Sequence, residues 1–218
     1  MRRTRERTLL LTLGALSALV LGAAGCDDEA EDFDIDGSVF GDADPGDIEA
    51  VTYVFVATND PAGNELVAYV AFDEGTLVER ARAGTGGTGA NLTGDAADPL
   101  GSQDSLIYVE DYLFVVNAGS NTVASFAFEE RDPDEAPRLE LLSVESSGGS
   151  GPVSLTYYDE NLFVVNADGA ITGFDVDDGL LLPKADGSTR LAGGFAPGTI
   201  EYRIDGDDLL VTDRAGDQ

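Results

Sequence analysis

Histidine is absent from this sequence of 218 residues, and cysteine and lysine occur once each, as Cys26 and Lys184. The lack of histidine excludes a Ser/His/Asp triad and any acid or base that is an imidazole. A single cysteine cannot form a disulfide within the chain, and the usual Cys and His spacings of zinc sites are missing. Long apolar runs are scarce too, because the one at residues 9–21 is shorter than the roughly 20 residues of a transmembrane helix. Carboxylates remain available for general acid–base catalysis.

Positive charge is also scarce. The 12 Lys and Arg residues stand against 42 Asp and Glu residues, which gives a formal net charge of −30. A surface with this charge repels phosphate backbones, so we expect no nucleic-acid partner. The sequence has no Gly-rich phosphate loop between a strand and a helix, and we expect no cofactor. A small molecule, neutral or cationic, or a protein ligand fits this composition better.

The N-terminus has the order of features that is typical of an export signal. Four arginines lie within residues 1–8, the apolar run of residues 9–21 follows, and a series of small residues precedes Cys26. An ordinary signal peptide, cut near Ala24 and leaving a free thiol, is one interpretation of this pattern.

The same segment resembles the lipobox of bacterial lipoproteins, in which small residues precede a cysteine that becomes lipidated and N-terminal. Ala23 stands three residues before Cys26, where the lipobox usually has leucine. The resemblance implies a signal peptide at residues 1–25. It also implies a protein that is exported and lipid-anchored at the cell membrane or envelope through Cys26.

An acidic segment follows the cysteine. Residues 26–50 contain many Asp and Glu residues and no base, so we expect a disordered tether between lipid and domain. Asp32, Asp34 and Asp36, followed by glycine, match the start of a calcium-binding loop. The twelfth position of that loop needs a bidentate acid and is Ala43 here, so we expect no metal.

The remainder, residues 51–218, is built from repeats. Short alternating apolar segments are separated by Gly, Asp, Asn and Pro, which indicates an all-β fold. The segment Leu-Phe-Val-Val-Asn-Ala at 113–118 recurs at 162–167, and weaker copies lie at 55–59 and 209–213. The Asn or Asp of successive copies is 58, 49 and 47 residues apart. Such a period is typical of a β-propeller blade, and predicts about three and a half four-stranded blades.

One unit predicts the order of strands in a blade. Pro152–Tyr158 would be the innermost strand, Asn161–Asn166 the second, residues 170–176 the third and residues 180–191 the outer edge, with Asn-, Asp- and Gly-rich turns between them. The Gly-rich residues 84–101 are expected to form a loop that absorbs the longer first spacing. Because each blade buries a face against the next, an arc of blades would expose an apolar face at both ends.

Residues 113–123 resemble the YVTN-type repeat, and residues 147–154 resemble the blade junction of seven-bladed lactonase-like propellers. That family includes 6-phosphogluconolactonase-like proteins. The resemblance covers residues 51–218 and implies roughly half of a seven-bladed ring. Its motifs encode strands and turns and therefore specify the fold better than an activity.

Three residues are candidates for chemistry in such a ring, where the starts of inner strands face the central channel. Glu201 and Arg203 lie on one predicted inner strand, and Asp104 lies at the start of another. A carboxylate could act as general acid or base, and an arginine could clamp an anionic group. The alternative is that Glu201 and Arg203, two residues apart on one strand face, form a surface ion pair.

Two hypotheses about function follow. The first is a lipid-anchored binding or interaction module of the cell envelope, which is favoured by the leader, the tether and the lack of a recognisable catalytic set. The second is a lactonase-like hydrolase whose active site is incomplete in this segment, which rests on the family resemblance.

Overall fold

The computed structural model describes residues 52–72, 75–131, 135–203 and 208–214. The expected signal peptide, Cys26, the tether and the calcium candidates Asp32, Asp34 and Asp36 lie outside the described residues. All regular elements in the described ranges are β-strands, and these ranges contain no helix that could cross a membrane. The prediction of an all-β fold is confirmed.

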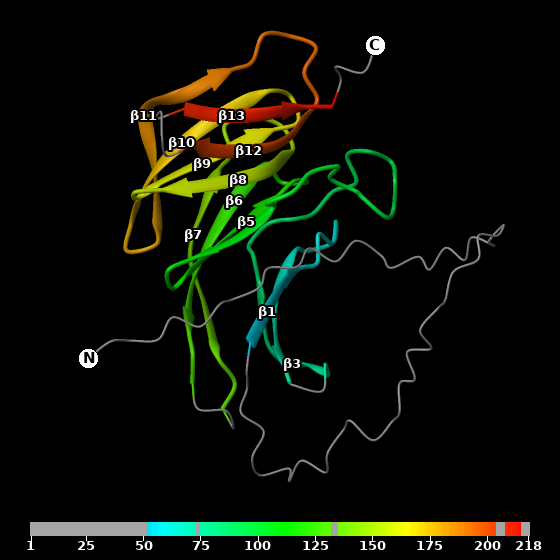
Figure 1. The fold of residues 1–218 in the computed structure, drawn as a ribbon, viewed down its shortest axis with the longest axis vertical. Coiled ribbons are helices and arrows are strands. Elements are labelled where there is room, and N and C mark those ends of the chain that lie inside the picture. Colours follow the sequence, from blue (N-terminus) through cyan, green and yellow to red (C-terminus); the bar gives the residue numbers. More distant parts are fainter. Residues whose placement is uncertain (1–51, 73–74, 132–134, 204–207, 215–218) are drawn as a thin grey trace, which may run out of the picture.

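Four antiparallel sheets follow one another along the chain, and each strand pairs with its sequence neighbours (Figure 1). We name them sheets A to D in chain order. Sheet A consists of β1 (Thr52–Ala57), β2 (Glu65–Ala71) and β3 (Leu77–Gly84). Sheet B consists of β4 (Leu106–Val109), β5 (Tyr112–Asn117), β6 (Thr122–Glu129) and β7 (Arg138–Ser146). Sheet C consists of β8 (Pro152–Tyr158), β9 (Asn161–Asn166), β10 (Ala170–Asp177) and β11 (Leu180–Arg190). Sheet D consists of β12 (Pro197–Arg203) and β13 (Asp208–Asp213). The strand order predicted from one unit is the order of sheet C.

Tight turns explain why neighbouring strands pair. Asp159 and Glu160, between β8 and β9, have φ values of 47° and 62°. Asp178 and Gly179, between β10 and β11, have φ values of 48° and 78°. Positive φ at both central positions gives the turn a twist that matches that of the two flanking strands. The local sequence therefore selects hairpins.

The repeated Leu-Phe-Val-Val-Asn segment forms the second strand of two successive sheets, β5 in sheet B and β9 in sheet C. Leu113 and Val115 of β5 belong to the apolar cluster between sheets A and B. Phe114 and Val116 belong to the cluster between sheets B and C. Burial on both faces explains why this segment is continuously apolar instead of alternating. The predicted equivalence of the two copies is confirmed.

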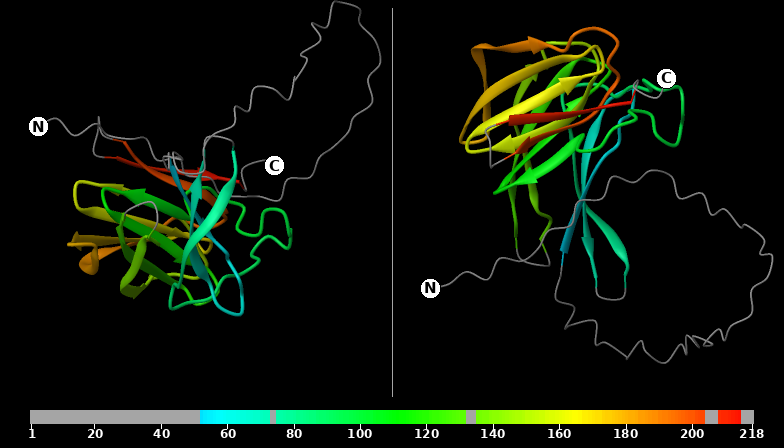
Figure 2. Two further views of the ribbon diagram at one scale, coloured as in Figure 1. Left: turned by 90° about the horizontal axis from the view of Figure 1, so that it is seen from below. Right: turned by 45° about the horizontal axis from the view of Figure 1, so that its top comes forward.

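The sheets stack face to face in chain order, and Figure 2 shows this stack from two further sides. The third apolar cluster joins Val153 and Val165 of sheet C to Ile200 of sheet D. Backbone N–H groups of sheet D also donate to side chains of β8. Ile200 donates to Ser154 Oγ at 3.1 Å, and Tyr202 donates to Thr156 Oγ1 at 3.1 Å.

Sheet D presents a polar outer face. Its residues Ile200, Leu209 and Val211 pack toward sheet C. The alternate residues on the opposite face are Thr199, Glu201, Arg203, Asp208, Leu210 and Thr212. Leu210, 51% exposed, is the one large apolar side chain among these described residues. The expectation of an apolar face at both ends of the stack is therefore wrong at this end. Apolar and polar residues alternate along β12 and β13, whereas β5 and β9 are apolar on both faces.

Three connecting segments, each with two consecutive glycines, lead from one sheet to the next at residues 84–90, 146–152 and 192–197. We call them junctions. A Cβ on Gly87 would lie 2.5 Å from Asn117 Cγ, and a Cβ on Gly149 would lie 2.6 Å from Asn166 Cγ. The second glycine of each of these two junctions thus packs against the asparagine that ends the repeated strand. No strand lies between Gly84 and Leu106, so the prediction of a loop at residues 84–101 is confirmed, and residues 84–90 of this loop form a packed junction.

Candidate functional site

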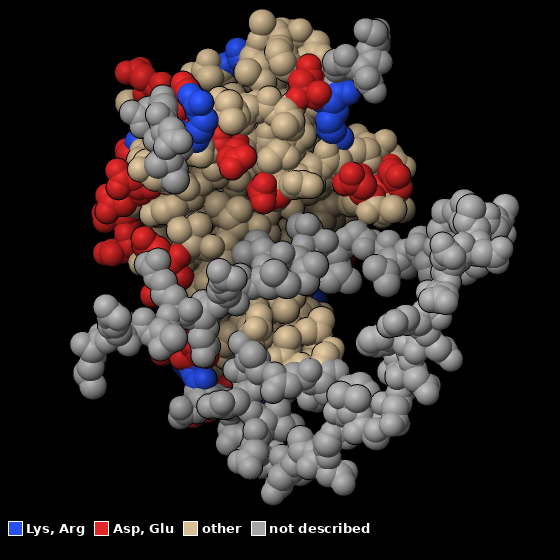
Figure 3. Space-filling model, in the orientation of Figure 1, with Lys and Arg blue, Asp and Glu red and all other residues tan. Residues whose placement is uncertain are grey.

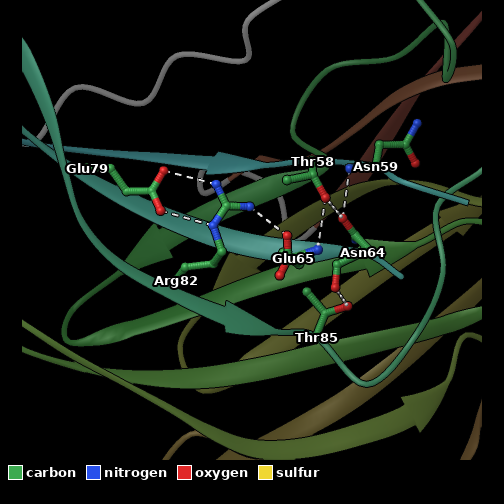
Figure 4. A network of polar contacts seen from close by, with 7 residues as sticks. All are labelled: Thr58, Asn59, Asn64, Glu65, Glu79, Arg82 and Thr85. Carbon is green, nitrogen blue, oxygen red and sulfur yellow. Dashed lines mark hydrogen bonds and ion pairs between the residues drawn. The ribbon is translucent and has the colours of Figure 1, made fainter. Parts of the chain in front are cut away.

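Hydrogen bonds join the first junction to sheets A and B, and Figure 4 shows Thr85 of this junction beside Asn64, which precedes β2. Asn117 Oδ1 accepts from Asn64 Nδ2 at 2.9 Å and from Thr85 Oγ1 at 2.6 Å. Asn64 Oδ1 accepts from the backbone N–H of Asn59 at 2.8 Å and from the Thr58 hydroxyl at 3.3 Å. Buried polar groups that satisfy one another in this way specify one arrangement of the backbone. The network fixes where the chain leaves sheet A.

The amide of Asn59 then sets the direction of the chain after the junction. Its Nδ2 donates to the carbonyl of Ala90 at 2.8 Å, and its Oδ1 accepts from the N–H of Ala90 at 3.0 Å. In sheets C and D the first strand begins at once, at Pro152 and Pro197. In sheet B, β4 begins only at Leu106, so residues 91–104 are an insertion, which we call the insertion loop.

The end of the insertion loop lies along β8. Ser102 Oγ donates to the carbonyl of Val153 at 2.7 Å, and the N–H of Leu155 donates to the carbonyl of Asp104 at 2.9 Å. These bonds hold the end of the loop beside β8. We call the first strands of sheets B, C and D, namely β4, β8 and β12, the inner strands.

A pocket of about 660 Å³ lies where these elements meet. Its walls are the C-terminal end of β1, the insertion loop, the starts of β4 and β12 and the end of β13. In Figure 1 this is the right-hand side of the sheets, where β13 ends and β12 begins. Its polar lining side chains include Asn59, Gln103, Ser105, Thr199, Thr212 and Arg214. This volume lies within the usual range of small-molecule sites.

Arg214 is the base that lines this pocket. Its Nε donates to the carbonyl of Ala196 at 3.4 Å and its Nη2 to the carbonyl of Pro197 at 3.3 Å. No carboxylate of the described residues lies within ion-pair distance of it, whereas Arg82, Arg138, Arg190, Arg203 and Lys184 all have such a partner. An arginine without an acid partner is unusual in a chain that is rich in acids.

Asp104 and Glu201, two of the residues singled out in the sequence, lie near each other. The carbonyl of Asp104 is bonded to Leu155 of β8. Glu201 lies between Ile200 and Tyr202, whose N–H groups bond the side chains on either side of Leu155. The two carboxyl-bearing residues therefore flank β8 at the same level. Asp104 also stands between Gln103 and Ser105, which line the pocket.

The surroundings of Asp104 favour its neutral form. Burial raises the pKa of the Asp104 carboxyl above its ordinary value, and the nearby charge of Glu201 raises this pKa further. The Asp104 residue is nevertheless exposed to solvent. A carboxyl group whose pKa is raised keeps its proton to a higher pH and can then donate it.

Arg203 does not join this pair. Its Nη2 donates to Asp208 Oδ2 at 2.5 Å across the β12–β13 hairpin, and both side chains are exposed. The alternative of a surface ion pair is therefore correct for Arg203, but its partner is Asp208 and not Glu201. The hairpin places Asp208 directly opposite Arg203.

Acidic side chains gather at the end of the sheets away from the pocket. The turns that follow β4, β8 and β10 carry the exposed acids Glu110, Asp111, Asp159, Glu160, Asp177 and Asp178. Figure 3 shows Asp and Glu along the left margin, where the turns after β8 and β10 lie in Figure 1. Among the described residues, no group of three or more potential ligands could hold a metal ion.

Reasoning from the sequence missed Arg214, and it predicted the insertion loop only as part of a longer loop at residues 84–101. Arg214 follows the last copy of the repeat, and nothing in the pattern of the sequence marks it as unpaired. The insertion loop had a visible signal, since the Gly-Gly segments at 86–87, 148–149 and 193–194 recur in the sequence. Aligning them shows extra residues before β4.

The four sheets place the protein in a class of all-β repeat proteins, and comparison with known proteins refines that class. No model of a known protein family matches the chain, and no curated protein matches it. Two solved structures, each described as a putative 6-phosphogluconolactonase, are similar. The one from Bacteroides fragilis has a TM-score of 0.51 and 24% identity, and the match covers 68% of this chain and 41% of that one.

The second structure, from Bacteroides uniformis, has a TM-score of 0.41 and 16% identity over 75% of this chain and 62% of that one. This chain thus spans less than two thirds of the length of either protein. The likeness to the Bacteroides fragilis protein concerns the fold: the stacked sheets are similar to those of a 6-phosphogluconolactonase-like protein.

Proposed function

We propose that the described residues are part of a β-propeller of the lactonase-like class, and that the pocket at the starts of its inner strands binds and hydrolyses a small cyclic ester. Four-stranded antiparallel units that stack face to face at a period near 50 residues support the propeller. The likeness of fold to the Bacteroides fragilis protein supports the class. The observation that carries the reaction is the carboxyl pair of Asp104 and Glu201, of which Asp104 lies between two residues that line the pocket.

Hydrolysis of a lactone needs one base and one acid. Water adds to the carbonyl carbon and gives a proton to the base, and the bond from that carbon to the ring oxygen breaks as the acid protonates this oxygen. In this proposal Glu201 is the base and Asp104, whose pKa is raised, is the acid.

Removing the proton of Asp104 tests this assignment. Asp104→Asn in the full chain is expected to lower kcat/KM for a δ-lactone by about 100-fold or more, because asparagine cannot donate a proton to the leaving oxygen. The rate of the unchanged protein should fall on the alkaline side as Asp104 ionises, and this limb should be missing in the variant. Asp208→Asn, which alters an exposed ion pair on the same sheet, is the control. Unchanged hydrolysis in Asp104→Asn and in Glu201→Gln would refute the reaction.

The raised pKa of Asp104 also makes stability depend on pH. The folded protein holds the Asp104 proton to a higher pH than the unfolded chain does, because folding raises this pKa. Its contribution to the free energy of unfolding is therefore complete below the ordinary pKa of aspartate and is lost as the pH rises through the raised value. The Asp104→Asn variant should lose this dependence, which denaturation at a series of pH values measures.

We also propose that the protein is exported and anchored by lipid on Cys26, which would display the propeller at the cell envelope. The order of basic, apolar and small residues before Cys26 supports this address. A display module that only binds its ligand would have the same anchor and pocket, and the hydrolysis experiment separates it from an enzyme.

Labelled fatty acid is expected to enter the protein in a bacterial host that processes lipoproteins. Cys26→Ser should abolish the label and release the protein from the membrane fraction, because the thiol is the one group in the chain that can carry this lipid. A mature N-terminus upstream of Cys26, or label that persists in the variant, would contradict the anchor.

A further inference from the structure

We propose that the pocket recognises one carboxylate group through Arg214 and prefers monoanions of sugar-acid size to phosphate dianions. This inference rests on the pocket of the proposed function. Hydrolysis of a lactone there would release a hydroxy acid, which carries such a carboxylate. It names the class of ligand and does not require that the chain catalyse anything.

The guanidinium of Arg214 is positioned but not neutralised. Its Nε and Nη2 donate to the carbonyls of Ala196 and Pro197, which hold the group at the pocket wall. Arg82 is the contrast, since Glu65 at 2.6 Å and Glu79 at 2.9 Å neutralise it on both sides. Since no described carboxylate pairs with it, this oriented guanidinium can form charge-assisted hydrogen bonds with an anionic ligand.

Gly101 of the insertion loop makes room for this arginine. A Cβ at residue 101 would lie 1.7 Å from Nη1 of Arg214, so no other residue leaves the guanidinium in its place. The N–H of Gly101 donates to Asp98 Oδ1 at 2.8 Å, which fixes the loop at this point. The insertion loop and the end of β13 therefore meet at the guanidinium.

The other charges around Arg214 disfavour a second negative charge on the ligand. Asp98 lines the same pocket, and Asp213 precedes Arg214 and accepts from the N–H of Ala196 at 2.9 Å. One guanidinium can balance one carboxylate, and these acids repel a dianion more strongly than a monoanion. The chain as a whole, at −30, acts in the same direction.

The remaining polar lining suits a ligand with several hydroxyl groups. Gln103, Ser105, Thr199 and Thr212 offer side chains that can both donate and accept hydrogen bonds. The hydroxyl of Thr212 already accepts from the N–H of Thr199 at 2.9 Å and can still donate to a ligand. A carboxylate at one end and hydroxyl groups along the chain describe a sugar acid.

Calorimetric titration of the full chain at fixed ionic strength and pH 7.5 tests the proposal, with gluconate as the monoanion, glucose as the neutral probe and glucose 6-phosphate as the dianion. Gluconate is expected to bind at least about tenfold more tightly than either of the others, which is the effect of one charge-assisted hydrogen bond. Arg214→Gln should remove this advantage. Arg203→Gln, which changes the same charge outside the pocket, should keep it.

Gly101→Ala should act like Arg214→Gln, because the added methyl group displaces the guanidinium. Gly94→Ala is the matched control, since Gly94 lies in the same loop with a φ of +80° and has nothing within 4 Å of its Cβ position. Thermal melts of each variant check that the fold is intact. The proposal is wrong if gluconate does not bind, if glucose 6-phosphate binds more tightly, or if Arg203→Gln weakens gluconate as much as Arg214→Gln does. Binding of gluconate by a chain that hydrolyses no lactone would refute the proposed reaction and leave this inference standing.

Discussion

Phe114→Ala is expected to lower the free energy of unfolding by about 3–5 kcal/mol, the usual cost of emptying a phenylalanine site in a core. The Phe114 side chain is fully buried in the cluster between sheets B and C, where it packs with Leu162 and Phe174. Its ring also stacks on that of Tyr157, with centroids 5.9 Å apart. Alanine would leave a cavity between two sheets that the backbone hydrogen bonds of β5 prevent from closing.

Chemical denaturation of the full chain measures this effect, with the salt concentration held constant because the net charge of −30 makes stability depend on screening. Leu210→Ala is the control, since Leu210 is 51% exposed on the outer face of sheet D and its loss should change stability by less than about 0.5 kcal/mol. Equal effects of the two substitutions would show that sheets B and C do not form a common core.

Gly89→Ala is expected to destabilise the protein by about 3 kcal/mol or more, the upper range for a group forced into a packed site. A Cβ on Gly89 would lie 2.0 Å from the carbonyl oxygen of Asn59. This atom belongs to the backbone, so rotation of a side chain cannot relieve the clash. The N–H of Gly89 also donates to the carbonyl of Asp60 at 2.8 Å, so the junction cannot move away without losing this bond.

Gly84→Ala, in the same junction, provides the comparison. Gly84 has nothing within 4 Å of its Cβ position and its φ is not positive, so alanine should leave stability unchanged or raise it by up to about 1 kcal/mol. Both variants are compared by denaturation at one salt concentration. A Gly89→Ala variant as stable as Gly84→Ala would mean that the junction at residues 84–90 is not tightly packed.

Much of the fold could be predicted from local patterns. The hairpins of sheet C follow from the turns at Asp159-Glu160 and Asp178-Gly179, because a two-residue turn of positive φ acts on the strands beside it. The equivalence of β5 and β9 follows from their repeated letters. The loop at residues 84–101 was predicted, but the packing of its first residues was not, because glycine is the residue of flexible loops and also the residue of tightest packing, and composition alone does not separate these two uses.

The candidate site could be predicted only in part. Asp104 and Glu201 were identified because inner strands of a propeller begin near a central channel, but their proximity and the raised pKa of Asp104 depend on hydrogen bonds that both elements make to β8. For Arg203 the expected surface partner was Glu201, two residues away on the same strand. The structure pairs Arg203 with Asp208, which lies directly opposite it across the hairpin.

Three properties could be predicted from the sequence alone: the all-β fold, the repeat of units with a period near 50 residues, and the segments that occupy equivalent strands. These properties depend on alternation, turn residues and repetition, which act over a few neighbouring positions. That Arg214 stands over Gly101, with no acid partner among the described residues, and that the insertion loop closes a pocket with the end of β1 depend on the tertiary structure. Those groups come from distant parts of the chain, and their meeting depends on how three sheets stack, which no local pattern encodes.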